Sequence, residues 1–98
     1  MSAKEAYEAE RKAYLAGFAA NVKRLRAEHE PPLSQTGLCD ATGLHRTEIS
    51  KIENGEVEPR LATLAVLAAG LDTTIDELIR GLPLPRERKP PPPPARGA

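Results

Sequence analysis

The sequence is poor in aromatic residues and cysteine. Aromatic side chains make up 3% of the 98 residues, tryptophan is absent, and Cys39 is the one cysteine. No internal disulfide can form, and a core has to be built from Leu, Ile, Val and Ala. No run approaches the roughly 20 apolar residues of a membrane span, and the charged start MSAKEAYEAERK lacks the apolar stretch of a signal peptide. We therefore expect a small cytoplasmic protein without a membrane partner.

The sequence also lacks the usual signs of catalysis. His29, Cys39 and His45 have a spacing that matches no zinc pattern. There is no glycine-rich phosphate loop, and the carboxylates are scattered rather than paired in an evident pocket. We predict that the protein is not an enzyme and has no catalytic residues, no metal and no cofactor, and that Cys39 is a buried, unreactive side chain.

Neither sign of charge is in excess over the whole chain, which has 14 basic and 14 acidic residues. The two ends differ, because residues 83–98 hold four basic residues and one acid, so that residues 1–82 carry a net charge of −3. A net negative charge opposes non-specific binding to nucleic acid, which depends on attraction to phosphates. A local basic patch remains compatible with this balance.

The first part of the chain has the apolar spacing of a helix with one buried face. Four apolar residues recur at spacings of 3, 4 and 3, namely Leu15, Phe18, Val22 and Leu25. Ser2 and Glu5 have the spacing of a capping box, and Pro31-Pro32 ends the helix. Before residue 14 only Tyr7 and alanines continue the face, so residues 1–13 are expected to be a helical extension, either frayed or packed separately.

Shorter helices follow. Ser34 is a good N-cap for a helix to about Ala41, and the turn at Gly43 leads to a third helix over residues 46–54 that Gly55 closes. Pro59 suits the first turn of a fourth helix that ends near Gly70, and Thr74-x-x-Glu77 opens a fifth. The fold class is therefore all-α, a compact bundle of four to five short helices in residues 14–82.

The remaining segment, residues 83–98, is proline-rich and basic. Its five consecutive prolines, Pro90–Pro94, cannot build a core, so we expect a disordered tail. The segment Pro91-x-x-Pro94-x-Arg96 matches a polyproline ligand for an aromatic groove. Such short matches arise often by chance, and a solubilising or linking tail is the favoured interpretation.

The third predicted helix has one apolar and one polar side. Ile49 and Ile52 mark the buried side on a helical wheel, and the opposite side holds polar residues without an acid, namely Arg46, Thr47, Ser50, Lys51 and Asn54. Glu48 and Glu53 lie at the edges. Two short helices joined by a glycine-containing turn are typical of a helix-turn-helix, and such a polar side can enter a DNA major groove about 12 Å wide.

At these residues the sequence resembles the phage-repressor/Cro-type, or XRE-like, helix-turn-helix family. The pattern is Ser34-Gln35-x-x-Leu38-Cys39-x-x-x-Gly43-Leu44-x-x-x-x-Ile49-Ser50-Lys51-x-Glu53-Asn54-Gly55, followed by Pro59 and Thr63-Leu64. The resemblance covers about residues 18–80, and implies a repressor-like bundle and binding of double-stranded DNA. Glu56 and Glu58 depart from it, because they add negative charge to a loop that commonly approaches phosphate in the family.

The resemblance also implies residue roles. The base-reading residues would be Arg46, Thr47, Ser50 and Lys51, and the phosphate-contacting residues would be Gln35, His45 and Asn54. An exposed bystander is the alternative for His45. In the family a first-helix arginine pairs with the glutamate before the Asn-Gly step, and the matching structural ion pair here is Arg26 with Glu53.

The sequence thus predicts a transcriptional regulator, a repressor, that binds specific double-stranded DNA as a homodimer through helix 46–54. The alternative is an antitoxin or other protein-interaction module of the same fold, with a toxin or another regulator as its partner. That alternative is motivated by the net charge of −3 and the N-terminal extension.

Overall fold

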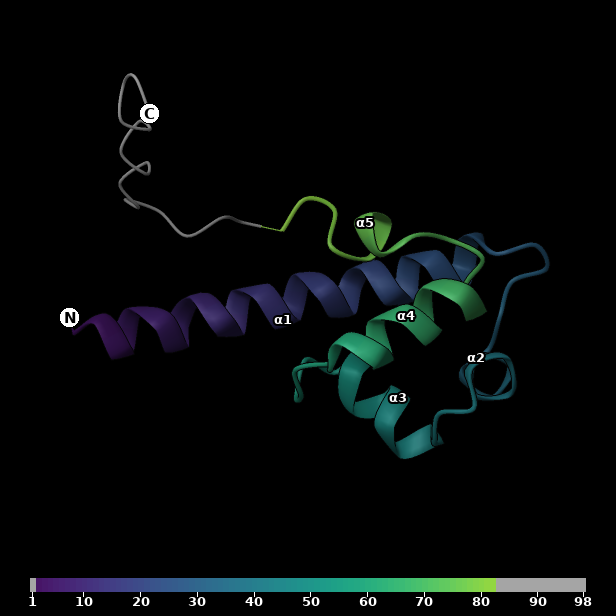
Figure 1. The fold of residues 1–98 in the computed structure, drawn as a ribbon, viewed down its shortest axis with the longest axis horizontal. Coiled ribbons are helices and arrows are strands. Elements are labelled where there is room, and N and C mark those ends of the chain that lie inside the picture. Colours follow the sequence, from purple (N-terminus) through teal and green to yellow (C-terminus); the bar gives the residue numbers. More distant parts are fainter. Residues whose placement is uncertain (1, 83–98) are drawn as a thin grey trace, which may run out of the picture.

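The computed structural model describes residues 2–82, and this part of the chain folds into helices without a strand (Figure 1). The helices are α1 (Ala3–Glu28), α2 (Gln35–Thr42), α3 (Arg46–Glu53), α4 (Leu61–Gly70) and α5 (Ile75–Leu78). The expected all-α bundle with a helix-turn-helix is confirmed. The expected disordered tail, residues 83–98, lies outside the described residues.

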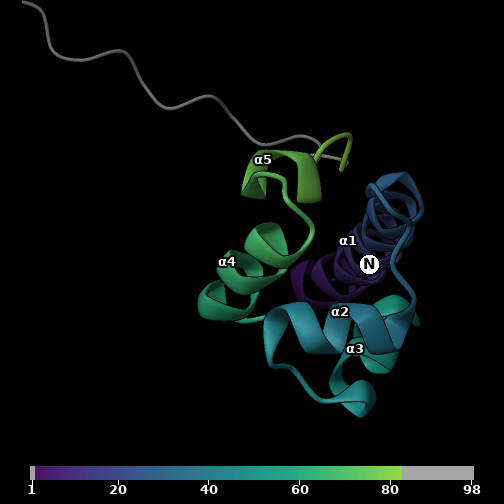
Figure 2. The same ribbon diagram turned by 90° about the vertical axis from the view of Figure 1, so that its right-hand side faces the viewer.

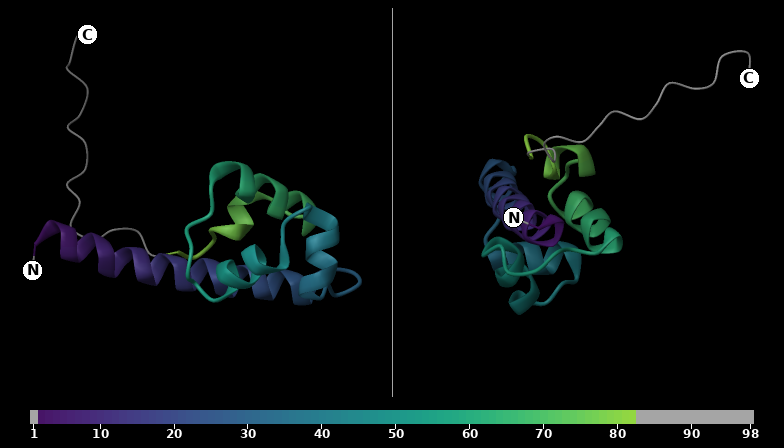
Figure 3. Two further views of the ribbon diagram at one scale, coloured as in Figure 1. Left: turned by 90° about the horizontal axis from the view of Figure 1, so that it is seen from below. Right: turned by 90° about the vertical axis from the view of Figure 1, so that its left-hand side faces the viewer.

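Helix α1 is one continuous rod that is longer than the rest of the bundle. At 26 residues it spans about 39 Å. Its second half packs against the other helices, whereas its first half extends beyond them (Figure 3). The predicted cap is confirmed, since the Ser2 hydroxyl accepts a hydrogen bond of 3.1 Å from the Glu5 backbone N–H. The predicted extension is therefore helical and continuous with α1, rather than frayed or packed separately.

Capping residues set the geometry of the helix-turn-helix. The Ser34 hydroxyl accepts from the Gly37 N–H at 2.9 Å and starts α2, as predicted. Gly43 ends α2 with a φ of +77°, which glycine adopts without the steric cost of a side chain. Helix α3 ends at Glu53, one residue earlier than expected, because Asn54 has φ −95° and ψ 0° and Gly55 follows with φ +71°.

One apolar core joins all five helices. Its buried members are Phe18, Val22, Leu25, Leu38, Ile49, Ile52, Leu67, Ala68, Leu71 and Leu78. The four apolar residues predicted to share one face of α1 are each at most 8% exposed. Full burial of a Leu or Ile side chain contributes about 1.5–3 kcal/mol, so these contacts hold α3 against α1 and fix which side of α3 faces outward.

Helices α4 and α5 complete the bundle: α4 packs against α2 and α5, and α5 also packs against α1 (Figure 2). Helix α4 begins at Leu61 after the extended Arg60, so Pro59 precedes the helix instead of lying in its first turn. The Thr74 hydroxyl accepts from the Glu77 N–H at 3.3 Å, which confirms the second cap. The Asn21 amide donates to the carbonyls of Leu78 and Arg80 at 2.8 and 3.0 Å, and so ties the end of α5 to α1.

Candidate nucleic-acid interface

The inner side of α3 is almost fully buried. Ile49 and Ile52 are 0% and 1% exposed, which confirms that they turn inward. The third inward residue is charged: Glu53 is only 3% exposed. A carboxylate at that depth needs a partner, because an unpaired buried charge is strongly unfavourable.

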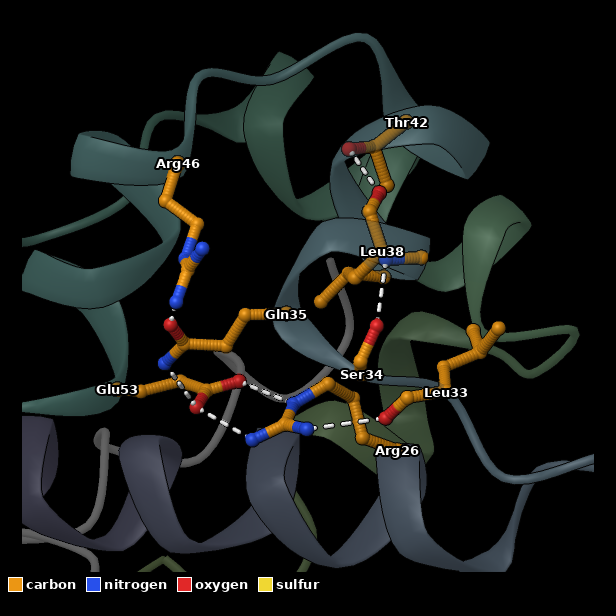
Figure 4. Close-up of polar contacts among 9 residues, drawn as sticks. Arg26, Leu33, Ser34, Gln35, Leu38, Thr42, Arg46 and Glu53 are labelled. Carbon is orange, nitrogen blue, oxygen red and sulfur yellow. Dashed lines mark hydrogen bonds and ion pairs between the residues drawn. The ribbon is translucent and has the colours of Figure 1, made fainter.

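Arg26 of α1 supplies that partner. Its Nε donates to Glu53 Oε2 at 2.7 Å and its Nη2 donates to Glu53 Oε1 at 2.8 Å, which is a bidentate pair (Figure 4). Its Nη1 donates to the Leu33 carbonyl oxygen at 2.9 Å. The structure thus brings together the two residues of the predicted ion pair, and one guanidinium joins α1, the segment before α2 and the end of α3.

The pair changes the protonation chemistry of both residues. Burial raises the pKa of the Glu53 carboxyl, but hydrogen bonds from Arg26 and Gln35 and the charges of Arg26 and Lys23 outweigh it, so this pKa lies below its ordinary value. The hydrogen bond to Glu53 raises the pKa of Arg26 although burial opposes it. Glu53 therefore stays ionised in the folded protein well below neutral pH.

The outer side of α3 is accessible. Arg46, Thr47 and Lys51 are exposed and Ser50 is half-buried, and we call these four residues the reading face. Helix α1 packs on the inner side, through Ile49 and Ile52, and leaves this edge uncovered. The reading face is therefore accessible to the major groove of DNA. Its contacts with bases stay a prediction.

The Gln35 side chain, which is expected to contact phosphate, also makes hydrogen bonds within the protein. Its Nε2 donates to Glu53 Oε1 at 3.0 Å, and its Oε1 accepts from Arg46 Nε at 3.1 Å. Arg46 Nη1 also approaches Thr36 Oγ1 at 3.4 Å. These contacts have no signature in the sequence, because side chains 11 and 18 residues apart give no periodic signal. The expected contact of Gln35 with phosphate stays a prediction.

The other two residues expected to touch phosphate lie at the ends of α3. His45 is the exposed residue before α3, and Asn54 is the exposed residue after it. An open groove of about 600 Å³ runs beside α3 towards the start of α4. It is lined by residues that include His45, Thr47, Glu48, Lys51, Glu58 and Arg60.

Acidic residues border the interface. Glu48 and Glu58 line the groove, and Glu56 is exposed in the loop between α3 and α4. Arg11 of the α1 extension forms a salt bridge of 3.4 Å with Glu58. No local pattern in the sequence predicts this contact, because the two residues are 47 positions apart. It places a cation beside one of the two loop acids that oppose phosphate binding.

Between residues 2 and 82 there is no group of three His, Cys, Asp or Glu side chains that could hold a metal ion. Within the same range no helix has the length and apolar character needed to cross a membrane. Cys39 is half-buried rather than buried as expected, and it packs against the core.

Comparison with known proteins agrees with this geometry. A model of the helix-turn-helix family matches residues 22–78. Control protein C.SmaI of Serratia marcescens is 39% identical over 62 residues, which are 63% of this chain and 71% of that protein. The crystal structure of the restriction-modification controller protein C.AhdI from Aeromonas hydrophila has a TM-score of 0.60 and 31% identity, covering 65% of this chain and 94% of that chain.

These matches confirm the resemblance noted in the sequence and point to a family of DNA-binding regulators rather than of enzymes. They extend over α2 and α3, where the helix-turn-helix and its exposed edge lie. The chain belongs to the helix-turn-helix family, and it is a DNA-binding transcriptional regulator.

Proposed function

We propose that this regulator reads a specific double-stranded DNA sequence by placing the reading face of α3 in the major groove. The observation that carries the proposal is the exposure of Arg46, Thr47 and Lys51 on a helix whose other side is fixed in the core. Arg46 and Lys51 can donate to guanine O6 and N7, and the Thr47 methyl group can contact thymine.

Phosphate contacts would fix the position of α3 in the groove. Gln35 lies at the start of α2, where free backbone N–H groups favour an anion, and His45 and Asn54 flank α3. One N–H of the Gln35 amide is not used by its bond to Glu53 and can still reach a phosphate. We assign these three residues to the DNA backbone and the Arg26–Glu53 pair to the fold.

We further propose that the active form is a homodimer joined through α4 and α5. Leu61, Val66 and Ile79 are 76%, 37% and 43% exposed, and Ala62, Ala65 and Ala69 are exposed on α4 beside the first two. A clustered apolar face is typical of an interaction site. A two-fold pair would read half-sites about 10 bp apart.

The relatives support a regulatory setting for this activity. Because C.SmaI is named a control protein and C.AhdI a restriction-modification controller protein, we propose that this chain controls promoters of a restriction-modification system. Repression is the sign that we propose. In a reporter assay with the chain's own upstream region, expression of the chain should lower the signal, and a raised signal would make it an activator.

In vitro selection of binding sites from random duplexes tests the DNA proposal. The wild type should enrich a two-fold symmetric site, and Arg46→Ala should relax one base position in each half and cost about 1–3 kcal/mol of binding. Arg80→Ala is the matched control, since it removes the same charge from an exposed residue after α5. If no site is enriched, or if Arg46→Ala and Arg80→Ala behave alike, the proposed reading face is wrong.

Sedimentation tests the dimer. Val66→Glu places a charge in the apolar face and should give a monomer that has lost tight binding to the two-fold site. Ala27→Glu adds the same charge to an exposed position of α1 and should remain a dimer. A wild-type protein that is monomeric at micromolar concentration, both free and on DNA, would contradict the dimer.

A further inference from the structure

The last described residues of the chain run along α1 towards its N-terminus. The Asn21 amide donates to the carbonyl oxygens of Leu78 and Arg80 at 2.8 and 3.0 Å. One helical turn nearer the start of α1, Leu82 lies against Gly17, where a Cβ atom would be 2.6 Å from Leu82 Cδ2. The chain therefore advances along α1 in the direction opposite to that of the helix. Continued in this direction, the chain after Leu82 meets the first half of α1.

The first half of α1 has a face of small residues that continues from this contact. Its members follow one another at spacings of 4, 3, 4 and 3, so they share one side of the helix. We call them the α1 stripe, namely Gly17, Ala13, Glu10, Ala6 and Ala3. Glu10 is the one charged member. Tyr7 and Tyr14 flank the stripe, and Tyr7 is 55% exposed.

This half of α1 has little else to stabilise it. It extends beyond the other helices, and in residues 2–82 no other helix lies beside it (Figure 3). A separate helix shorter than about 12–15 residues is only marginally stable in water. A partner on the α1 stripe would stabilise the extension by covering its tyrosine rings and pairing its carboxylate.

The segment that follows Leu82 fits the α1 stripe in length. Residues 83–89 are seven residues, which span about 22 Å as polyproline II, and α1 rises about 21 Å between Gly17 and Ala3. Pro83 and Pro85 favour this extended conformation. Proline-rich segments of this kind bind surfaces lined by aromatic rings, such as those of Tyr7 and Tyr14.

The segment also fits the α1 stripe in charge. Residues 83–98 hold four basic residues and one acid, whereas residues 1–82 have a net charge of −3. The first of these basic residues is Arg86, four residues or about 12 Å of polyproline II after Leu82. Glu10 is about 10 Å along α1 from Gly17. The first cation of the segment thus falls opposite the carboxylate of the stripe.

We propose that the α1 stripe is a binding site for the chain's own segment 83–89, which runs antiparallel to α1 and pairs Arg86 with Glu10. The inference goes beyond the proposed reading of DNA and does not depend on it. The contact of Leu82 with Gly17 is the first step of this packing. Pro90 would then follow at the level where α1 begins.

A spin label measures the proximity of the two segments in the full chain. Cys39→Ser removes the native thiol, and Arg86→Cys carries a nitroxide label. In nuclear magnetic resonance spectra we expect the amide signals of residues 6–13 to lose intensity, and a label at Ala95→Cys should affect them less. Unchanged signals with the Arg86→Cys label would overturn the inference.

A mixed sample separates this packing from exchange between two copies. Spin-labelled chains without ¹⁵N are added to unlabelled chains with ¹⁵N, so that only a contact between chains can weaken the signals. We expect no loss for residues 6–13. A loss as large as that within one chain would give the α1 stripe to a second copy, and the intramolecular site would be wrong.

Charge reversal in the chain that keeps Cys39 provides an independent test. Glu10 has no charged residue three or four positions away in α1, so Glu10→Lys breaks no ion pair of that spacing within the helix. Amide hydrogen exchange of residues 6–13 should become about twofold to fivefold faster, the effect of one exposed ion pair. Arg86→Glu should restore slow exchange in the Glu10→Lys chain.

Arg96→Glu in the same Glu10→Lys chain is the matched control, because it makes the same charge change at the far end of the segment. We expect it to leave exchange fast. Restoration by both reversals alike would show that only net charge matters, and restoration by neither would show that Arg86 does not pair with Glu10. Either result would overturn the inference. Circular dichroism confirms that each variant is folded.

Discussion

Helix α3 is only eight residues long, and yet its two sides differ sharply in burial and in polarity. The inner side carries Ile49, Ile52 and the paired Glu53, each at most 3% exposed. The outer side carries Arg46, Thr47 and Lys51, which are exposed. A change on the inner side is expected to alter folding, whereas a change on the outer side is expected to alter binding of DNA without altering folding.

The largest effect is expected at the inner ion pair. Glu53→Ala leaves the half-buried Arg26 without its carboxylate, and breaking such a pair from one side costs about 3–5 kcal/mol of unfolding free energy. Chemical denaturation measures this loss. Glu56→Ala, in the exposed loop after α3, is the control and should change stability by at most about 0.5 kcal/mol. Equal effects of the two substitutions would show that the pair does not stabilise the fold.

Ile49→Ala comes next. It removes a fully buried core side chain of α3, a helix that packs against α1 and α2, and the cavity should cost about 2–5 kcal/mol. The neighbouring Thr47→Ala, on the outer side, should leave the denaturation midpoint almost unchanged. A stable Ile49→Ala protein would contradict the placement of α3 in the core.

The outer side is expected to give the reverse result. Lys51→Ala should lower affinity for the selected site by about 1–3 kcal/mol while unfolding free energy changes by at most about 0.5 kcal/mol. Lys12→Ala, on the exposed surface of α1, is the matched control. Titration with fluorescent duplex gives the first quantity and denaturation the second. A loss of stability without a loss of affinity would remove Lys51 from the reading face.

The smallest effect is expected in the pH dependence of the unfolding free energy, which should change in acid and not near neutrality. Because the pKa of Glu53 is lowered in the folded state, its contribution is complete above the ordinary carboxyl pKa of 4.5 and is lost as the pH falls through the lowered value. Wild type and Glu53→Gln should therefore have a constant difference in stability from pH 5 to 7 that shrinks in more acidic solution. Thermal unfolding at several pH values measures it, and a constant difference throughout would contradict the lowered pKa.

Local patterns in the sequence predicted most of the fold. The caps at Ser2, Ser34 and Thr74 and the turn at Gly43 depend on neighbouring residues, so the sequence displays them directly. The inward direction of Ile49 follows from helical periodicity in the same way. The start of α4 was placed too early, because Pro59 is compatible both with a first helical turn and with the extended segment that precedes it.

The contacts of the candidate site were less predictable. The pairing of Arg26 with Glu53 was expected only from the family resemblance, since no periodicity relates residues 27 positions apart. The bonds of Gln35 with Glu53 and Arg46 depend on the angle between α2 and α3, which one sequence does not encode in any local pattern. Arg11 reaches Glu58 only because α1 continues unbroken past the bundle.

The segment between α1 and α2 illustrates how such a protein tolerates changes in chain length. It is closed at its base by two hydrogen bonds between the same two residues: the Leu33 N–H donates to the Arg26 carbonyl oxygen at 3.0 Å, and Arg26 Nη1 donates to the Leu33 carbonyl oxygen at 2.9 Å. The residues between them form a surface excursion, so inserted or deleted residues there would enlarge or shrink the excursion without shifting α2. Since the entropy of closing a loop rises slowly with its length, evolution can lengthen this connection while the register of the DNA-reading unit stays the same.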